Sequence, residues 1–261
     1  TWVEADATVP VGGNESRAEG RVVTDLEVLL ISQPAGAQAG GDVDCFHSCE
    51  YGALAKFVLL DLTGHGAERS AIARSLHEIL HQYSNEISPA QLLELVNRQY
   101  NPPAGPIILA TAFVATFDPG DGVFRFSNAG QPRPLHWSAV LRQWSILLEA
   151  QRSDCGLPLG ILKTACYDEE AVAFSSGDIL LLSSDALPET QNTAGDVLEP
   201  EGAIRLLQEA SQELRENFSL SSLAQEFLRR VEQFRGEPGF DDDLTMLWLR
   251  RLPSGVAERT N

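Results

Sequence analysis

The sequence has few cysteines, few positive charges and no long apolar segment. Four cysteines among 261 residues are too few for a dense disulfide framework and favour a reducing, cytoplasmic setting. Only 19 lysines and arginines oppose 37 acidic residues, which gives a formal net charge of −18. Because nucleic acids and anionic lipids are bound through basic patches, this charge balance argues against both classes of partner. We therefore expect a cytoplasmic protein with no nucleic-acid partner and no membrane partner.

No apolar stretch reaches the roughly 20 residues that a membrane-spanning helix requires. The longest candidate, Pro106–Phe117, has twelve residues and contains two threonines. The beginning of the chain, Thr1–Asp6, is acidic and lacks the basic and apolar regions of a secretory signal. Because the chain does not start with Met, we expect an excised fragment or a processed form.

Hydrophobic patterning predicts an α+β protein. Helical periodicity appears over Ile72–Tyr83, after Ser88-Pro89, and twice within Glu201–Phe234, with a break near 217–219. Strands, two helices, further strands, two helices and a last strand follow one another, a pattern typical of this class. Hairpin-like spacing predicts mostly antiparallel strands. The folded part is expected to begin with the apolar segment Leu26–Ser32. The predicted strands are Val43–Cys49, Leu54–Asp61, Ala110–Phe117, Val123–Ser127, Ala171–Phe174, Ile179–Ser183 and Leu244–Leu249.

The domain organisation expected from composition is simple, because no internal repeat or low-complexity tract interrupts the chain. Residues 1–24 are polar and glycine-rich, which predicts a flexible N-terminal arm. Residues 25–251 are expected to form one domain, and 252–261 a C-terminal tail.

Four short motifs place an aspartate at the edge of an apolar run, where a strand end would project it into a cleft. A carboxylate at a buried strand end is costly unless a cation or a donor meets it. Oxygen ligands suit Mg²⁺ or Mn²⁺ rather than zinc, and several carboxylates suggest more than one ion. Each motif alone is equally typical of a turn, but four together favour ion binding. The motifs are Gly40-Gly41-Asp42, Asp61-Leu62-Thr63-Gly64-His65-Gly66, Ser184-Asp185-Ala186 and Asp241-Asp242-Asp243-Leu244-Thr245.

In this order and spacing, the motifs resemble the type 2C metal-dependent protein phosphatase superfamily, in the bacterial branch typified by the stage II sporulation protein E phosphatase. The resemblance covers about Leu26–Arg250 and includes Thr111-Ala112-Phe113, Ser127–Pro132 and Gly156–Gly160. It implies an antiparallel β-sandwich flanked by helices, in α-β-β-α layers. It also implies a hydrolase of phosphoserine or phosphothreonine in proteins, in which two cations, Mn²⁺ or Mg²⁺, activate a water.

The resemblance further implies a bacterial signal-transduction role, with a phosphorylated protein as substrate, such as an anti-sigma-factor antagonist. It assigns Asp61 as the ligand that bridges both ions, with the backbone carbonyl of Leu62 beside it. His65 is expected to support Asp61 in its turn or to serve as a general acid, so both are catalytic candidates. The remaining metal ligands are expected to be Asp42, Asp185 and Asp242, with Asp243 as the less favoured substitute for Asp242.

Three positions depart from the usual pattern of this branch. Ala186 stands where glycine usually follows the aspartate, Gln131 where histidine is frequent, and Cys45 where a second aspartate is frequent. A methyl group at 186 restricts the backbone, which suggests an alternative function as a catalytically weak pseudophosphatase that binds phosphoproteins.

A competing motif is His77-Glu78-Ile79-Leu80-His81, which has the spacing of a zinc metalloprotease helix. Its histidines are expected on the polar side of the helix near Arg74, so solvent-facing histidines are the favoured interpretation. Cys45, His47 and Cys49 would share one strand face, but they lack a fourth ligand and are expected to pack ordinarily. The helices within Ala67–Tyr100 are hypothesised to gate metal binding in response to a partner.

Overall fold

The computed structural model describes residues 2–4, 17–35, 43–49, 54–62, 67–100, 108–148, 156–214, 218–237 and 239–253. Its Cα positions group into two compact units, each built from separated parts of the chain. The first unit comprises Thr1–Glu15, Gly36–Gln131 and Asp154–Phe174, and the second comprises Ser16–Ala35, Pro132–Ser153 and Ser175–Asn261.

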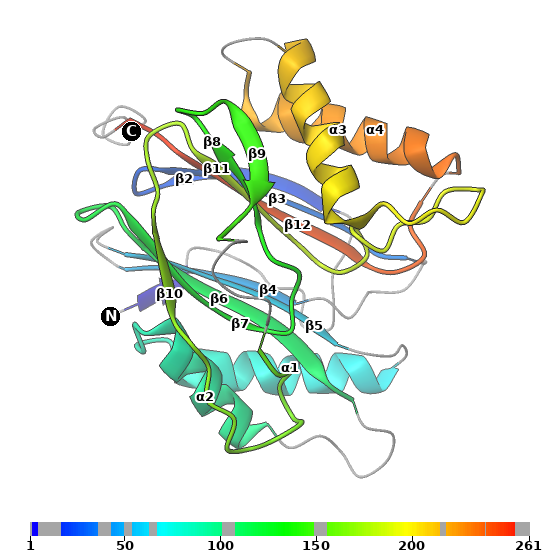
Figure 1. Cartoon of the computed structure of the whole chain (residues 1–261). Helices are drawn as coiled ribbons and strands as arrows, with labels where there is room; N and C mark the ends of the chain where they lie inside the picture. Colours follow the sequence, from blue (N-terminus) through cyan, green and yellow to red (C-terminus); the bar gives the residue numbers. More distant parts are fainter. Residues whose placement is uncertain are drawn as a thin grey trace. The chain divides into compact units, whose positions relative to one another are not determined.

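The first unit is a six-stranded sheet with a pair of helices, α1 (Ala67–Gln82) and α2 (Pro89–Gln99), on one face (Figure 1). Its strand order is β1-β4-β5-β6-β7-β10, and every adjacent pair is antiparallel. The strands are β1 (Trp2–Glu4), β4 (Val43–Cys49), β5 (Ala55–Leu62), β6 (Ala110–Asp118), β7 (Val123–Ala129) and β10 (Glu170–Ala173).

The core between this sheet and its helices explains which way Asp61 faces. Leu60 and Leu62 belong to the apolar cluster that the helices cover with Leu76 and Leu93, and all four side chains are buried. Successive strand residues point to opposite faces of a sheet, so Asp61 lies on the face away from the helices.

The second unit repeats the arrangement with another six-stranded antiparallel sheet, in the order β2-β3-β12-β11-β8-β9. Trp248 and Phe227 meet edge to face in the apolar core that α3 (Glu199–Leu214) and α4 (Leu220–Arg235) share with this sheet. The strands are β2 (Arg17–Val23), β3 (Leu26–Gln33), β8 (Leu135–Ser138), β9 (Gln143–Ile146), β11 (Ile179–Ser183) and β12 (Leu244–Arg251).

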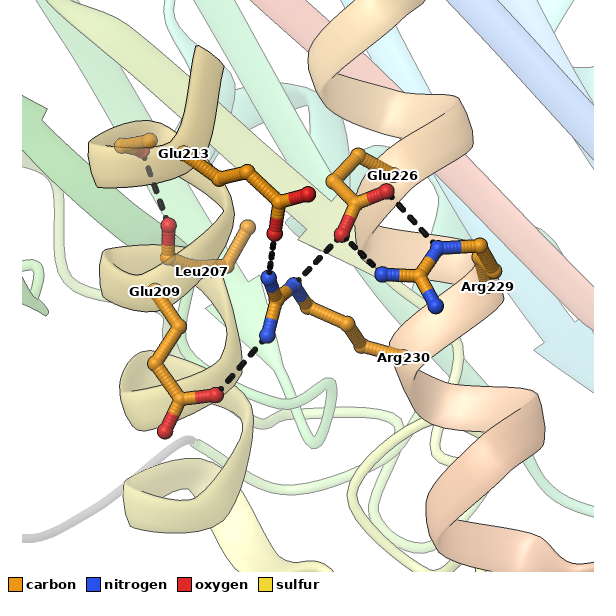
Figure 2. Close-up of polar contacts among 7 residues, drawn as sticks. Leu207, Glu209, Glu213, Glu226, Arg229 and Arg230 are labelled. Carbon is orange, nitrogen blue, oxygen red and sulfur yellow. Dashed lines mark hydrogen bonds and ion pairs between the residues drawn. The ribbon is translucent and has the colours of Figure 1, made fainter. Parts of the chain in front are cut away.

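An ion network joins the two helices of the second unit (Figure 2). The Arg230 guanidinium on α4 lies 2.9 Å from the Glu209 carboxylate and also contacts Glu213, both on α3. On α4 itself it lies 2.7 Å from Glu226, which also accepts a hydrogen bond from Arg229 at 2.8 Å. Because the Arg230 side chain is only 15% exposed, these charges interact with less solvent screening than isolated surface pairs.

The predicted α+β class and its antiparallel strand pairing are confirmed. The helix predicted after Ser88-Pro89 and the break predicted near 217–219 are both present. Ser88 and Ser219 are the N-caps of α2 and α4, since each hydroxyl accepts a backbone N–H of the first turn. One prediction needs correction, because part of the expected flexible arm is β2, which pairs with β3 from Arg17 to Val23. The short strands β8 and β9 were not predicted either. Among the described residues, no helix has the length and apolar character needed to cross a bilayer.

Lys56 connects the sheet of the first unit to the turn between its helices. The chain has two lysines, and this one is almost fully buried in β5. Its Nζ donates hydrogen bonds to the carbonyl oxygens of Ser84, at 2.6 Å, and of Glu86. Burial lowers the pKa of Lys56 to about 8, although the charge of Glu86 acts in the opposite direction. The neutral amine retains two N–H donors, so both hydrogen bonds survive deprotonation.

We predict that the stability of the wild-type chain increases with pH, relative to a Lys56→Met variant, between about pH 8 and pH 10.5. The folded-state pKa of about 8 lies below the unfolded value of 10.5, so the unfolded chain binds more protons in this window. The relative gain in the free energy of unfolding should be at most about 3 kcal/mol. Urea denaturation of both chains at several pH values measures it, and parallel pH curves would contradict the expectation.

Candidate functional site

Asp61 and Leu62 end strand β5 in the first unit. Asp61 is half-buried and flanked by the fully buried Leu60 and Leu62. Directly opposite Asp61 on β6 is Thr111, while Leu62 pairs with Ala110. The neighbouring strand β4 begins at Val43, which pairs with Leu60. These pairings place the end of β5 beside the start of β6 and the start of β4, with Asp61 at this edge of the sheet.

The segment that follows β7 returns alongside β6. Asn128 clamps it from both sides, because its Oδ1 accepts the Gln131 N–H at 2.8 Å and its Nδ2 donates to the Gln131 carbonyl at 2.9 Å. Gly130 has a φ of +88°, and a Cβ there would lie 3.1 Å from Cγ2 of Thr111. The Gln131 side chain is buried, and its Nε2 donates to the Thr111 hydroxyl at 2.9 Å. Two residues of the Ser127–Pro132 motif, Gly130 and Gln131, therefore pack against Thr111, the residue opposite Asp61.

The Gly156–Gly160 motif packs against the same place. Leu159 exchanges two backbone hydrogen bonds with Ala110, at 2.7 and 3.3 Å, directly before Thr111. Gly156 lies so close to β7 that a Cβ would approach the Asn128 carbonyl oxygen to 2.3 Å. Gly160 donates its N–H to the buried amide of Asn97 on α2 at 2.9 Å. Three motifs that are distant in the sequence thus form one cluster around the start of β6.

In the second unit, a buried serine joins the strand ends that carry the other candidate ligands. The Ser184 hydroxyl donates to the Asp243 carbonyl at 2.9 Å and accepts the Thr245 N–H at 3.0 Å, while the Ser184 N–H donates to the Thr245 carbonyl at 2.9 Å. Ser184 precedes Asp185, and Asp243 follows Asp242. The hydrogen bonds therefore bring the motifs of Asp185 and Asp242 side by side.

The structure distinguishes Asp242 from Asp243. Asp243 is 6% exposed, and its Oδ1 accepts the Ala35 N–H at 2.8 Å. Asp242 is exposed, and one of its oxygens accepts the N–H of Asp243 at 2.8 Å. The Asp243 carboxylate is thus bonded within the fold, whereas the exposed Asp242 carboxylate bonds through one oxygen to the backbone of its own neighbour. This arrangement supports the assignment of Asp242 rather than Asp243 as a ligand.

Ala186 does not strain the backbone. The non-glycine residues with positive φ in the described part of the chain are Thr24, Arg142, Leu148 and Glu199, so Ala186 has an ordinary conformation. Its methyl group is buried against the apolar core of the second unit, and its carbonyl accepts the Thr190 hydroxyl at 2.7 Å. The methyl group expected to restrict the backbone at this position therefore causes no backbone strain in the structure.

The predicted site residues fall into two groups. Asp61 and Leu62 lie in the first unit, and Asp185 and Asp242 lie in the second. Asp42 and His65 lie outside the described residues. No cluster of three or more His, Cys, Asp or Glu side chains with the geometry of a metal site occurs within the described part of the chain.

The zinc-protease motif gains no support from the structure. It lies on α1, where His77 is half-buried while Glu78 and His81 are exposed. Over the ranges that the structure describes, no third His, Cys, Asp or Glu gathers with the two histidines. Cys45, His47 and Cys49 lie on β4, as predicted.

Comparison with known proteins identifies the family. Residues 52–252 match the model of the stage II sporulation protein E (SpoIIE) family. The chain belongs to the SpoIIE family. The resemblance inferred from the motifs is thereby confirmed. This SpoIIE-family chain is 25% identical over 232 residues to the phosphoserine phosphatase RsbU of Bacillus subtilis. The match covers 87% of the chain and 63% of RsbU, so the chain spans less than two thirds of that relative.

Solved structures show the same fold. The RsbU and RsbW domains of Rv1364c from Mycobacterium tuberculosis match with a TM-score of 0.74 and 24% identity, over 89% of the SpoIIE-family chain and 63% of the solved one. The PP2C phosphatase domain of SpoIIE from Bacillus subtilis matches with a TM-score of 0.68 and 16% identity, over 90% of the SpoIIE-family chain and 70% of the solved one. At these identities the comparison establishes the fold alone.

We predict that Gly156→Ala destabilises the chain far more than Gly195→Ala. Both glycines have left-handed φ angles, +70° and +88°, which cost an alanine about 1 to 2 kcal/mol. Only Gly156 faces a backbone oxygen at 2.3 Å, whereas nothing lies within 4 Å of a Cβ at Gly195. Moving that backbone should raise the loss to about 3 kcal/mol or more. Urea denaturation measures both, and equal losses would contradict the close approach of the loop to β7.

Proposed function

We propose that this chain is a metal-dependent protein serine/threonine phosphatase that hydrolyses phosphoserine or phosphothreonine. Membership of the SpoIIE family is the observation that carries the proposal. The similarity to the phosphoserine phosphatase RsbU supports the reaction class. The acidic motifs of the sequence supply candidate oxygen ligands for the proposed cations.

The proposed ligands are those expected from the sequence motifs, namely Asp42, Asp61 with the Leu62 carbonyl, Asp185 and Asp242. All of these donors are oxygens, which suits Mg²⁺ or Mn²⁺. The Asp61 side chain is half-buried at the end of a buried strand, and a carboxylate that is partly removed from water is favoured by a nearby cation. When bound, two such cations would lower the pKa of a water and offset the charge of the phosphoryl oxygens.

The described residues then act by positioning. The β5–β6 pairing fixes Asp61 opposite Thr111, so its carboxylate needs little reorganisation to bind ions. Three hydrogen bonds join Ser184, which precedes Asp185, to Asp243 and Thr245, which follow Asp242. His65 is proposed as a supporting residue or general acid beside Asp61.

The proposed biological setting is bacterial regulation in the cytoplasm. By analogy with RsbU, the substrate would be a small phosphorylated regulator of a sigma-factor pathway, such as an anti-sigma-factor antagonist. The net charge of −18 repels a phosphorylated protein at long range. Bound cations are therefore proposed to supply the local attraction for the phosphoryl group.

The purified chain is predicted to hydrolyse 4-nitrophenyl phosphate with Mn²⁺ and to lose this activity in EDTA. Asp61→Asn should lower kcat/KM at least about 100-fold, because loss of a direct ligand should cost no less than loss of an outer-shell residue. Asp241→Asn is the matched control, since the Asp241 side chain is 81% exposed and pairs with Arg235. Tight Mn²⁺ binding without hydrolysis of the ester or of a phosphoprotein would instead support the pseudophosphatase.

Replacing neighbouring aspartates should separate metal binding from folding. Asp242→Ala is predicted to weaken Mn²⁺ binding at least about 10-fold with little loss of stability. Asp243→Ala should lower the free energy of unfolding by about 1 to 3 kcal/mol, because the Ala35 N–H loses its acceptor. Calorimetric Mn²⁺ titration and urea denaturation report the two effects. The reverse pattern would make Asp243 the ligand.

A further inference from the structure

Gln131 is a buried polar residue with no role in the ligand set. Its side chain is 1% exposed, and its Nε2 lies 2.9 Å from the Thr111 hydroxyl oxygen and 3.5 Å from the Thr111 carbonyl oxygen. A carbonyl oxygen only accepts hydrogen bonds, so the amide nitrogen rather than the amide oxygen must face Thr111. The chemistry of the partner thus fixes the orientation of the Gln131 amide.

This orientation constrains the hydroxyl of Thr111. A hydroxyl oxygen that accepts a hydrogen bond from Gln131 directs its own proton elsewhere. Thr111 lies directly opposite Asp61, and directly opposed residues in an antiparallel pair have Cβ atoms about 4.5 to 5.5 Å apart on the same face. The Asp61 carboxylate is therefore a nearby acceptor for that proton.

The other end of the Gln131 amide is also informative. Its Oε1 is buried, and no donor among the described residues reaches it. A buried carbonyl oxygen without a donor costs about 1 to 3 kcal/mol in other proteins. The Asn128 clamp and the close approach at Gly130 nevertheless hold Gln131 in this place. Such a costly arrangement is typical of a functional site.

We infer that Gln131 is a positioning residue for the cation site: its amide N–H donates to the Thr111 hydroxyl and so directs the hydroxyl proton toward Asp61, the residue opposite Thr111. This inference rests on the proposed function. Outer-shell hydrogen bonds of this kind orient a ligating carboxylate and contribute about 10- to 100-fold to metal affinity. Gln131 itself touches neither the reacting atoms nor, by this assignment, the ions.

The test is Mn²⁺ affinity of the whole chain, measured by calorimetry and by the electron paramagnetic resonance of free Mn²⁺. Gln131→Met keeps the shape but removes both polar atoms, and it should weaken Mn²⁺ binding about 10-fold. Thr111→Val removes only the hydroxyl and should have a similar effect. Gln131→His retains an N–H donor and an acceptor nitrogen, so it should bind Mn²⁺ within about threefold of the wild type. Thermal unfolding in EDTA verifies that each variant is folded.

A double variant distinguishes positioning from general damage. If Gln131 acts through Thr111, the two replacements remove the same interaction. The double variant Gln131→Met with Thr111→Val should then lose much less Mn²⁺ affinity than the roughly 100-fold product of the two single losses. A fully additive loss, an unchanged affinity of Gln131→Met, or a failure of Gln131→His to retain binding would each overturn the inference. A wild-type chain that binds no Mn²⁺ would overturn the proposed function as well, whereas the other outcomes leave that function intact.

Discussion

The structure depends on how a negative charge is placed at the end of a buried strand. Strand β5 has a fully buried leucine on each side of Asp61, and both leucines pack under α1 and α2. Because side chains alternate along a strand, Asp61 points to the opposite face of the sheet, where Thr111 is its partner on β6. A carboxylate in such surroundings is stable only when donors or cations meet it. The need to satisfy this charge links the core of the first unit to its proposed chemistry.

In both units a polar side chain next to a candidate site bonds to backbone groups beyond the end of its own strand. Ser184 joins the chain after β11 to the start of β12, and Asn128 joins the end of β7 to Gln131. Hydrogen bonds of this kind keep strand ends rigid where the ladder itself stops. Rigid carboxylates are a requirement for binding small, strongly hydrated cations such as Mg²⁺, which tolerate little distortion of their coordination.

The four helices and most strands were predictable from sequence, whereas β2, β8 and β9 were not. The caps at Ser88 and Ser219 and the apolar runs of β5, β6 and β11 carry local signals that tertiary structure did not override. Strand β2 is mostly polar and lies at a sheet edge. Its backbone pairs with β3, but its sequence shows little of the hydrophobic alternation from which a strand is predicted. Strands β8 and β9 have four residues each, too few for a period of two to emerge.

The sequence by itself indicated the family, because the residue types and order of its motifs are those of the SpoIIE family. It also identified the Ser127–Pro132 and Gly156–Gly160 motifs, although not what they do. Only the tertiary structure decided that Asp243 is buried on the Ala35 N–H while Asp242 is exposed. Only the structure showed that Gln131 reaches Thr111 and that Ala186 is unstrained. The physical reason is that burial, backbone angle and hydrogen-bond partner depend on residues far away in the sequence, whereas a motif records only its neighbours.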